Sequence, residues 1–171
     1  MAFAAVGQGK NASINAFDVV AGQPRVITAT GSYVPSVAAS PDGRQIAHVE
    51  APEDAKGTAL WLVDAGGGTP RRVAVLPFAT PGTGLAWTPD GRCVLMADYD
   101  RTSKKSGIRR VSVADGTFVS TGVAFDGMFD GLSISPDSRQ LAVGGGVSKN
   151  EAWVLENFLP KPAAGTASKR K

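Results

Sequence analysis

The tetrapeptide Ser40-Pro41-Asp42-Gly43 recurs twice further along the chain, as Thr88-Pro89-Asp90-Gly91 and as Ser135-Pro136-Asp137-Ser138. Each copy is followed by an arginine and a short apolar run. The prolines of successive copies are 48 and 47 residues apart. A fixed period of this length is typical of repeat architectures, so the sequence predicts a chain built from structural repeats.

The turn itself predicts two antiparallel strands joined by a short hairpin. Proline fixes φ near the value needed at the second position of a type I turn, and aspartate can hydrogen-bond its own backbone at the next position. Glycine then takes the left-handed conformation that lets the hairpin close with a bulge. Ser138 stands where the other copies have glycine, and a left-handed backbone there would cost roughly 1 kcal/mol.

The composition of the 171-residue chain is that of a globular protein, with 43% hydrophobic and 19% charged residues. One cysteine, Cys93, excludes an intrachain disulfide. No apolar run is long enough to cross a membrane, and the first residues lack the features of a signal peptide. We expect a cytoplasmic location if the chain is complete as written, and a periplasmic or extracellular one if it is part of an exported parent.

The repeats predict an all-β fold made of four-stranded antiparallel units of about 47 residues, which we call blades. We name the strands of a blade a, b, c and d in chain order. The first complete blade is expected at 32–79, with strands at 34–39, 45–50, 59–64 and 71–76. The second is expected at 80–127, with strands at 83–87, 93–98, 108–114 and 117–123.

Partial blades are expected at both ends of this array. Residues 2–31 would supply strands b, c and d, with c at 13–19 and d at 24–29. Residues 128–159 would supply strands a, b and c, at 131–134, 140–144 and 151–157. The remaining tail, 160–171, is small, polar and basic, and its composition predicts disorder.

Four-stranded units at this period are typical of β-propellers. The run SPDGRQIA at 40–47, followed by LWLVD at 60–64, resembles the WD-like β-propeller repeat of the TolB type. The resemblance covers residues 2 to about 159, and segment 151–160 looks like the C-terminal end of such propellers in bacterial multidomain proteins. In those relatives the propeller often accompanies a kinase or serine-peptidase domain, but this sequence shows neither a Gly-x-Ser-x-Gly motif nor a kinase catalytic loop.

The family commonly has more blades than this chain supplies. The partial blade at 2–31 lacks strand a, and the partial blade at 128–159 lacks strand d. These two missing strands do not complement each other. We therefore expect an open arc or partial propeller, cut from a longer protein or completed by another chain. A compact four-bladed ring is the alternative. The unpaired strand edges of an arc would favour association.

The loops between strand d of one blade and strand a of the next form the predicted binding face. They would lie together near the central opening of the propeller, where exposed aromatic side chains beside carboxylates make a recognition surface. The alternative is that the phenylalanines pack between blades. The candidate residues of these d–a loops are Tyr33, Phe78, Phe125, Asp126, Phe129 and Asp130.

Two further residues, His48 and Cys93, have side chains that can act in catalysis. His48 is the only histidine, and it aligns with apolar strand positions of the other blades. It is therefore predicted to lie in the core or to line the channel rather than to act in catalysis. Cys93 aligns with glutamines of the other blades and is predicted to face solvent, without an adjacent base.

The loop that begins at Asp98 carries an Asp-x-Asp pair and a basic cluster. An EF-hand would need glycine and glutamate where Ser103 and Arg109 stand, so no metal site is predicted. The cluster could contact phosphates, but Asp98 and Asp100 offset part of its charge, and a solvated loop is the preferred interpretation. The basic residues are Arg101, Lys104, Lys105, Arg109 and Arg110.

Taken together, these patterns predict a non-catalytic β-propeller binding module, part of a larger sensor or scaffold protein. The alternative is the propeller fragment of a multidomain enzyme, a serine peptidase or a protein kinase, whose catalytic domain is absent from this chain. No cofactor is predicted. The expected partner is a protein or a small ligand at the propeller face, with self-association through open blade edges; neither a nucleic acid nor a membrane span is expected.

Overall fold

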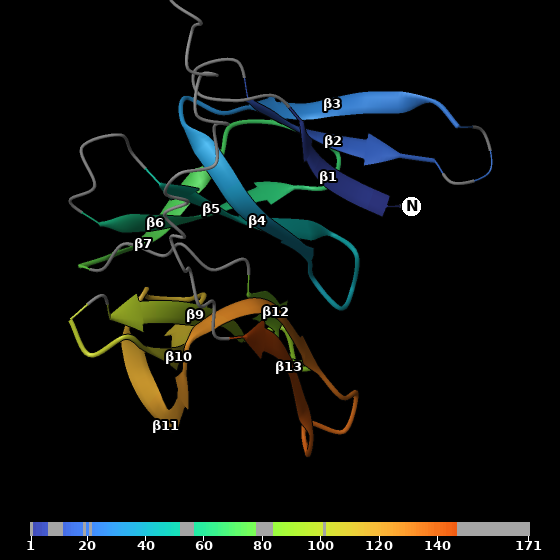
Figure 1. Cartoon of the computed structure of the whole chain (residues 1–171). Helices are drawn as coiled ribbons and strands as arrows, with labels where there is room; N and C mark the ends of the chain where they lie inside the picture. The colour runs from blue at the N-terminus through green and yellow to red at the C-terminus, as the bar shows by residue number, and fades with distance from the viewer. Residues whose placement is uncertain are drawn as a thin grey trace, which may run out of the picture.

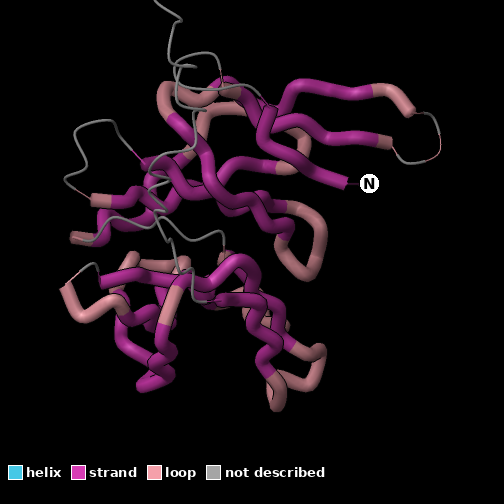
Figure 2. Tube along the Cα trace, in the orientation of Figure 1, coloured by secondary structure: helices cyan, strands magenta, loops and turns pink. Residues whose placement is uncertain are grey.

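The computed structural model describes residues 2–6, 12–18, 20, 22–51, 57–77, 84–100 and 102–146, with the main chain alone at positions 51 and 130. Within these ranges the chain forms strands and turns and no helix (Figure 2). No helix able to span a membrane is therefore found among the residues described. The prediction of an all-β fold is confirmed.

The described residues form four antiparallel sheets. The first contains β1 (Ala2–Val6), β2 (Ser13–Phe17) and β3 (Pro24–Ala29), in that order. The second contains β4 (Tyr33–Ala39), β5 (Gln45–Ala51), β6 (Thr58–Asp64) and β7 (Arg71–Leu76). The third contains β8 (Leu85–Trp87), β9 (Cys93–Asp100), β10 (Lys105–Ser112) and β11 (Phe118–Asp126), and the fourth, as far as it is described, contains β12 (Met128–Ile134) and β13 (Leu141–Gly146).

The sheets follow one another as an arc (Figure 1). In the second and third sheets the chain enters at the inner strand, β4 or β8, and works outward strand by strand to β7 or β11. The inner strands contact each other in sequence, β1 with β4, β4 with β8, and β8 with β12. This is the blade arrangement that the sequence predicted, and it brings equivalent turns of different blades together.

Apolar side chains fill the spaces between successive sheets, because neighbouring residues of a strand point to opposite faces. Ile46 of β5 packs against the first sheet, whereas Ala47 and Val49 pack toward the third. Between the third and fourth sheets, Ile108 and Phe129 are fully or almost fully buried. Burying a side chain of this size contributes about 1.5–3 kcal/mol, so these interfaces hold the sheets in place.

Several strand boundaries differ from the predictions. β3 and β7 coincide with the strands expected at 24–29 and 71–76, but β8 begins two residues later than expected, at Leu85. The predicted loop from Asp98 is wrong in part, because β9 does not end at Asp98 but continues to Asp100. Pairing of Asp100 with Lys105 extends the β9–β10 ladder and shortens the turn between them. The strand expected at 151–157 and the tail 160–171 lie outside the described residues.

Candidate functional site

The three repeated turns share one hydrogen-bonding pattern. In the first, the Ser40 hydroxyl donates to Asp42 Oδ1 at 2.6 Å and accepts the amide N–H of Gln45 at 2.9 Å. Asp42 Oδ1 also accepts the amide N–H of Arg44 at 3.1 Å. The same bonds recur around Thr88 and Ser135. Each turn is therefore a rigid unit that fixes the end of an inner strand.

The aspartates of these turns are held in the charged form. The hydroxyl bond from Ser40 or its counterpart, Thr88 or Ser135, lowers the carboxyl pKa below its ordinary value, and the backbone N–H of the following arginine adds to the effect. The affected residues are Asp42, Asp90 and Asp137. They place negative charge on the rim of the inner strands at neutral pH.

An open groove of about 540 Å³ lies where these turns meet, and we call it the inner groove. Its walls come from the last residues of β4, β8 and β12 and from the proline of each turn. The lining is mainly apolar and carries no charged side chain. The lining residues are Ala38, Ala39, Pro41, Ala86, Trp87, Pro89, Leu132, Ser133, Ile134 and Pro136.

Trp87 sets the shape of the inner groove. Its indole N–H donates to the carbonyl oxygen of Ala38 at 3.0 Å, which ties β8 to β4. A smaller hollow of about 200 Å³ lies beside the ring, between the first two turns, and Asp42 and Asp90 line it. A ligand in the inner groove would thus meet apolar walls with carboxylates at one side.

The predicted d–a residues lie at the opposite end of the inner strands from the inner groove, because strand a begins at the d–a loop and ends at the repeated turn. Tyr33 is 54% exposed at the start of β4. Phe125 is 42% exposed near the end of β11, and Asp126 carries an exposed ion pair with Lys105 at 3.7 Å. These three residues are available to solvent.

The remaining d–a candidates are Phe129, Asp130 and Phe78, and none of them is shown to be exposed. Phe129 is buried in the interface between the third and fourth sheets, where its ring stacks on Phe125 with centroids 5.4 Å apart. It therefore packs between blades, the alternative that the sequence left open. The main chain of Asp130 belongs to β12, and Phe78 lies outside the described residues. The structure thus brings Phe125 and Phe129 together.

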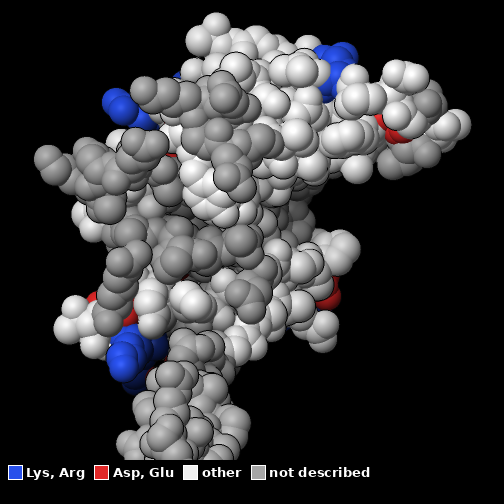
Figure 3. Space-filling view, turned by 45° about the horizontal axis from the view of Figure 1, so that its top comes forward, with Lys and Arg blue, Asp and Glu red and all other residues white. Residues whose placement is uncertain are grey.

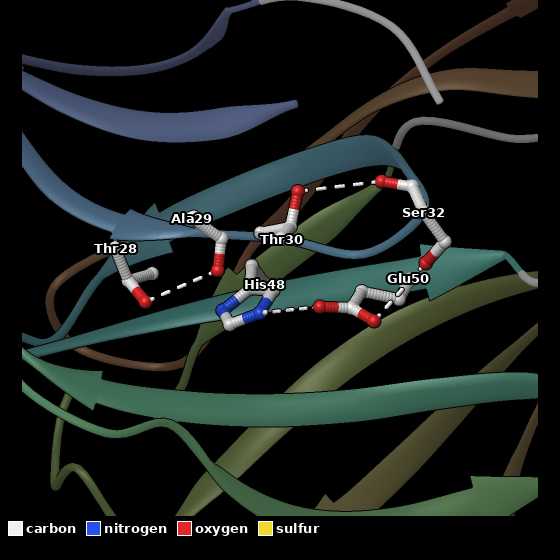
Figure 4. A network of polar contacts seen from close by, with 6 residues as sticks. All are labelled: Thr28, Ala29, Thr30, Ser32, His48 and Glu50. Atoms are coloured by element: carbon white, nitrogen blue, oxygen red, sulfur yellow. Dashed lines mark hydrogen bonds and ion pairs between the residues drawn. The ribbon is translucent and has the colours of Figure 1, made fainter. Parts of the chain in front are cut away.

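His48 belongs to a buried polar network between the first two sheets (Figure 4). It is fully buried, its Nε2 lies 3.3 Å from Glu50 Oε1, and the Ser32 hydroxyl donates to Glu50 Oε2 at 3.0 Å. Burial lowers the pKa of His48, and the neighbouring Glu50 acts in the opposite direction. His48 Nδ1 and the indole nitrogen of Trp61, stacked beside it, have no hydrogen-bond partner.

The basic cluster is partly neutralised. Arg109 Nε donates to Asp98 Oδ2 at 2.6 Å, and Lys105 faces Asp126. In Figure 3 a group of cationic side chains gathers at the lower left of the view with acidic atoms beside it. No group of three or more potential metal ligands occurs in the described part of the chain. Arg101 lies outside it.

Cys93 is a free cysteine at the start of β9 and is partly exposed. The inner groove, by contrast, was not predicted as a binding site. The signals available in the sequence were Trp87 and the proline of the repeated turn, since each of the three turns contributes its proline to the lining. Their convergence depends on how the blades are arranged in space.

Neither a protein-family model nor a curated protein matches the chain. Among solved structures, TolB from Acinetobacter baumannii has a TM-score of 0.64 at 20% identity, over 82% of this chain and 34% of that chain. A nidogen/laminin complex has a TM-score of 0.62 at 17% identity, over 78% of this chain and 49% of that one. A prolyl endopeptidase has a TM-score of 0.53 at 18% identity, over 79% of this chain and 23% of that one.

The chain thus spans between 23% and 49% of the length of these solved structures. Proteins that share its fold include an enzyme, the prolyl endopeptidase. At identities of 20% or less the likeness shows the fold alone. The sheets of this chain therefore have the fold of β-propeller blades, similar to those of TolB, and they form an arc.

Proposed function

We propose that residues 2–159 are β-propeller blades that act as a binding module, and that the inner groove takes an extended, mainly apolar segment of another protein. The observation that carries this proposal is the convergence of three equivalent strand ends on one apolar groove. Its volume of about 540 Å³ falls within the range of about 300–1,000 Å³ typical of ligand sites.

The chemistry of the groove favours a peptide segment. The proline rings make a rigid apolar surface, and Trp87, which is 6% exposed, backs it from the core. Trp87 is already fixed by its bond to Ala38, so little side-chain entropy is lost on binding. The charged aspartates at the side of the groove would favour a segment with a basic residue next to its apolar ones.

Selection of a random peptide library on the full chain, followed by fluorescence anisotropy with the selected peptides, tests this proposal. Ser133 lines the groove and is exposed, so Ser133→Arg would fill the groove and oppose the basic residue. We expect at least about a tenfold loss of affinity, which corresponds to about 1.4 kcal/mol. Thr117→Arg, an exposed turn position away from the groove, is the matched control. Equal binding to S133R would place the site elsewhere.

A second candidate is the propeller part of a multidomain enzyme. The likeness to a prolyl endopeptidase, of which the chain covers 23%, favours it. The coding sequence on both sides of residues 1–171 tests this candidate directly. An in-frame peptidase or kinase domain would support it, and in-frame stop codons without such a domain would exclude it.

A further inference from the structure

The contacts that join the first sheet to the second, and the second to the third, share one arginine clamp. Arg25 of β3 donates to the carbonyl oxygens of Ala65 and Gly66, both at 2.9 Å, in the turn between β6 and β7. Arg71 of β7 donates at 3.3 Å to the carbonyl oxygen of Val113, in the turn between β10 and β11. At both joints, therefore, an arginine of strand d secures the c–d turn of the following blade.

The strand-c residue opposite each clamp arginine is apolar and buried. Ala16 of β2 pairs with Arg25, and Leu62 of β6 pairs with Arg71. Ala16 and Leu62 are each 2% exposed. Each belongs to an apolar cluster that its own sheet forms with the next one. The following blade thus covers this face of strands c and d at both joints.

The third sheet carries the same two kinds of residue in exchanged places. Arg110 of β10 pairs with Val119 of β11, so the arginine is on strand c and the apolar residue is on strand d. The sequence shows the exchange, since Gly-Thr-Pro-Arg at 68–71 is replaced by Gly-Thr-Phe-Val at 116–119. Arg110 is exposed, and Val119 is 51% exposed. The described residues therefore leave open the face that the following blade covers at the other two joints.

Arg110 lies within reach of the place where a strand-d clamp would act. Residues directly opposite each other in an antiparallel ladder carry their side chains on the same face of the sheet, and neighbouring strands are about 4.8 Å apart. An arginine side chain is long and ends in a fork of N–H donors. The guanidinium of Arg110 can therefore cross this offset and meet carbonyl oxygens of a turn that lies against β11.

The segment that comes next in the fourth blade belongs to this chain. Residues 153–156 read Trp-Val-Leu-Glu, which matches Trp-Leu-Val-Asp at 61–64 of β6. In this alignment positions 157 and 158 correspond to Ala65 and Gly66, whose carbonyl oxygens accept the clamp at the first joint. The connection from β13 to position 151 has four residues, as many as the connection from β9 to β10. Its length therefore suffices for a strand c that begins at 151.

The composition of this segment suits the changed joint. The c–d turns of the second and third sheets are small and polar, with Gly-Gly-Gly-Thr at 66–69 and Ala-Asp-Gly-Thr at 114–117. Positions 158–160 read Phe-Leu-Pro instead. An apolar turn fits against Val119, which stands where the earlier joints have an arginine, because removing both apolar surfaces from water is favourable.

We propose that the face of the third sheet around Arg110 and Val119 is the docking surface for residues 151–160 of this chain. In this arrangement Arg110 donates to the main-chain carbonyl oxygens at 157 and 158, and Val119 packs against the apolar turn at 158–160. The arginine clamp thus continues at the third joint but comes from strand c. The docking surface lies on β10 and β11, whereas the inner groove is lined by β4, β8, β12 and the repeated turns.

Hydrogen exchange of the full chain, measured by mass spectrometry on peptic fragments, tests this proposal. We expect the amides of 151–157 to exchange at least about tenfold more slowly than those of 161–171. Arg110→Met should speed the exchange of 151–157 at least about fivefold, the order expected for the loss of a hydrogen bond from a charged donor. Arg44→Met is the matched control, because Arg44 is an exposed arginine that follows the first repeated turn.

A second substitution separates the clamp from a general effect of removing a positive charge. Val119→Arg in the Arg110→Met chain recreates the arrangement of the earlier joints, with an apolar residue on strand c and an arginine on strand d. We expect this double variant to recover most of the protection that Arg110→Met loses. Equal acceleration in Arg110→Met and Arg44→Met, or no recovery in the double variant, would overturn the proposal.

Chemical cross-linking identifies what occupies the docking surface. In a chain with Cys93→Ser, Val119→Cys and Asn157→Cys, a short bismaleimide should join the two new cysteines within one molecule. Val75→Cys with Asn157→Cys is the control pair, because Val75 is 55% exposed on β7. Cross-links formed only between molecules would assign the surface to a second copy. Equal yields for the two pairs, or unprotected amides at 151–157, would show that the segment does not dock there.

Discussion

At the scale of single residues, the three copies of the repeated turn show what glycine contributes, because one copy has a serine in its place. The backbone is left-handed at Gly43, Gly91 and Ser138, with φ of 69°, 68° and 60°. The predicted strain at Ser138 is therefore present. A Cβ at Gly43 or Gly91 would meet nothing within 4 Å, so the cost of a side chain at these turns comes from the backbone alone.

We expect Ser138→Gly to stabilise the protein by about 0.5–1 kcal/mol, because glycine relieves the left-handed strain. Gly43→Ala should destabilise it by a similar amount, about 1 kcal/mol. Urea denaturation of both variants beside the wild type measures these changes. A loss of stability in S138G would show that the serine side chain is worth more than the strain it causes.

His48 gives the fold a dependence on pH. Its pKa is lowered from 6.5, chiefly by burial, so below pH 6.5 the unfolded chain binds a proton that the folded chain resists. The stability associated with neutral His48 is present above pH 6.5 and is lost as pH falls below it. The turn aspartates titrate in a separate range, because their pKa values lie below 3.8.

We expect the free energy of unfolding to fall between pH 7.5 and pH 5.5 in the wild type. His48→Gln keeps a donor for Glu50 but does not titrate, so its free energy of unfolding should change less over this range. Urea denaturation at both pH values provides the measurement. Equal slopes for the two proteins would assign the pH dependence to other groups.

At the scale of elements, the joint between β7 and the β10–β11 turn is the tightest contact of an outer strand with the following blade. A Cβ at Gly116 would collide with the carbonyl oxygen of Val73. Gly91 has nearly the same φ, 68° against 73°, but no neighbour within 4 Å. The two glycines therefore differ in their surroundings and hardly in their backbone.

Gly91→Ala should cost about 1 kcal/mol from backbone strain. Gly116→Ala should cost at least about 2 kcal/mol, because the turn must also move away from β7. The difference between the two losses of stability, measured by urea denaturation, gives the contribution of the contact between β7 and the β10–β11 turn. Equal losses would mean that the turn shifts freely and does not hold the blades together.

Prediction from the sequence succeeded where the chain carries local signals. β3 and β7 were predicted to the residue, since prolines and arginines mark their beginnings. The inner groove was not predicted, because its lining comes from three blades and only the arrangement of the blades brings Pro41, Pro89 and Pro136 together. The environments of Phe125 and Phe129 could not be told apart either, since neighbouring phenylalanines differ in burial through packing alone.

At the scale of the whole molecule, stability is concentrated in the middle of the arc. The central strands β5 and β9 are paired on both sides and are largely buried. β1 and β13, toward the two ends of the arc, are mostly exposed. In repeat proteins stability is roughly a sum over repeats and their interfaces, so blades with fewer interfaces open more readily.

We therefore expect hydrogen exchange to be slowest in β5 and β9 and at least about a hundredfold faster in β1 and β13. Exchange measured by mass spectrometry on peptic fragments resolves these strands. Trp87→Phe removes the bond from β8 to Ala38 and should speed exchange in β4 and β8 more than in β1. Uniform protection across all strands would instead mean that the arc opens as one cooperative unit, with its end sheets as stable as its centre.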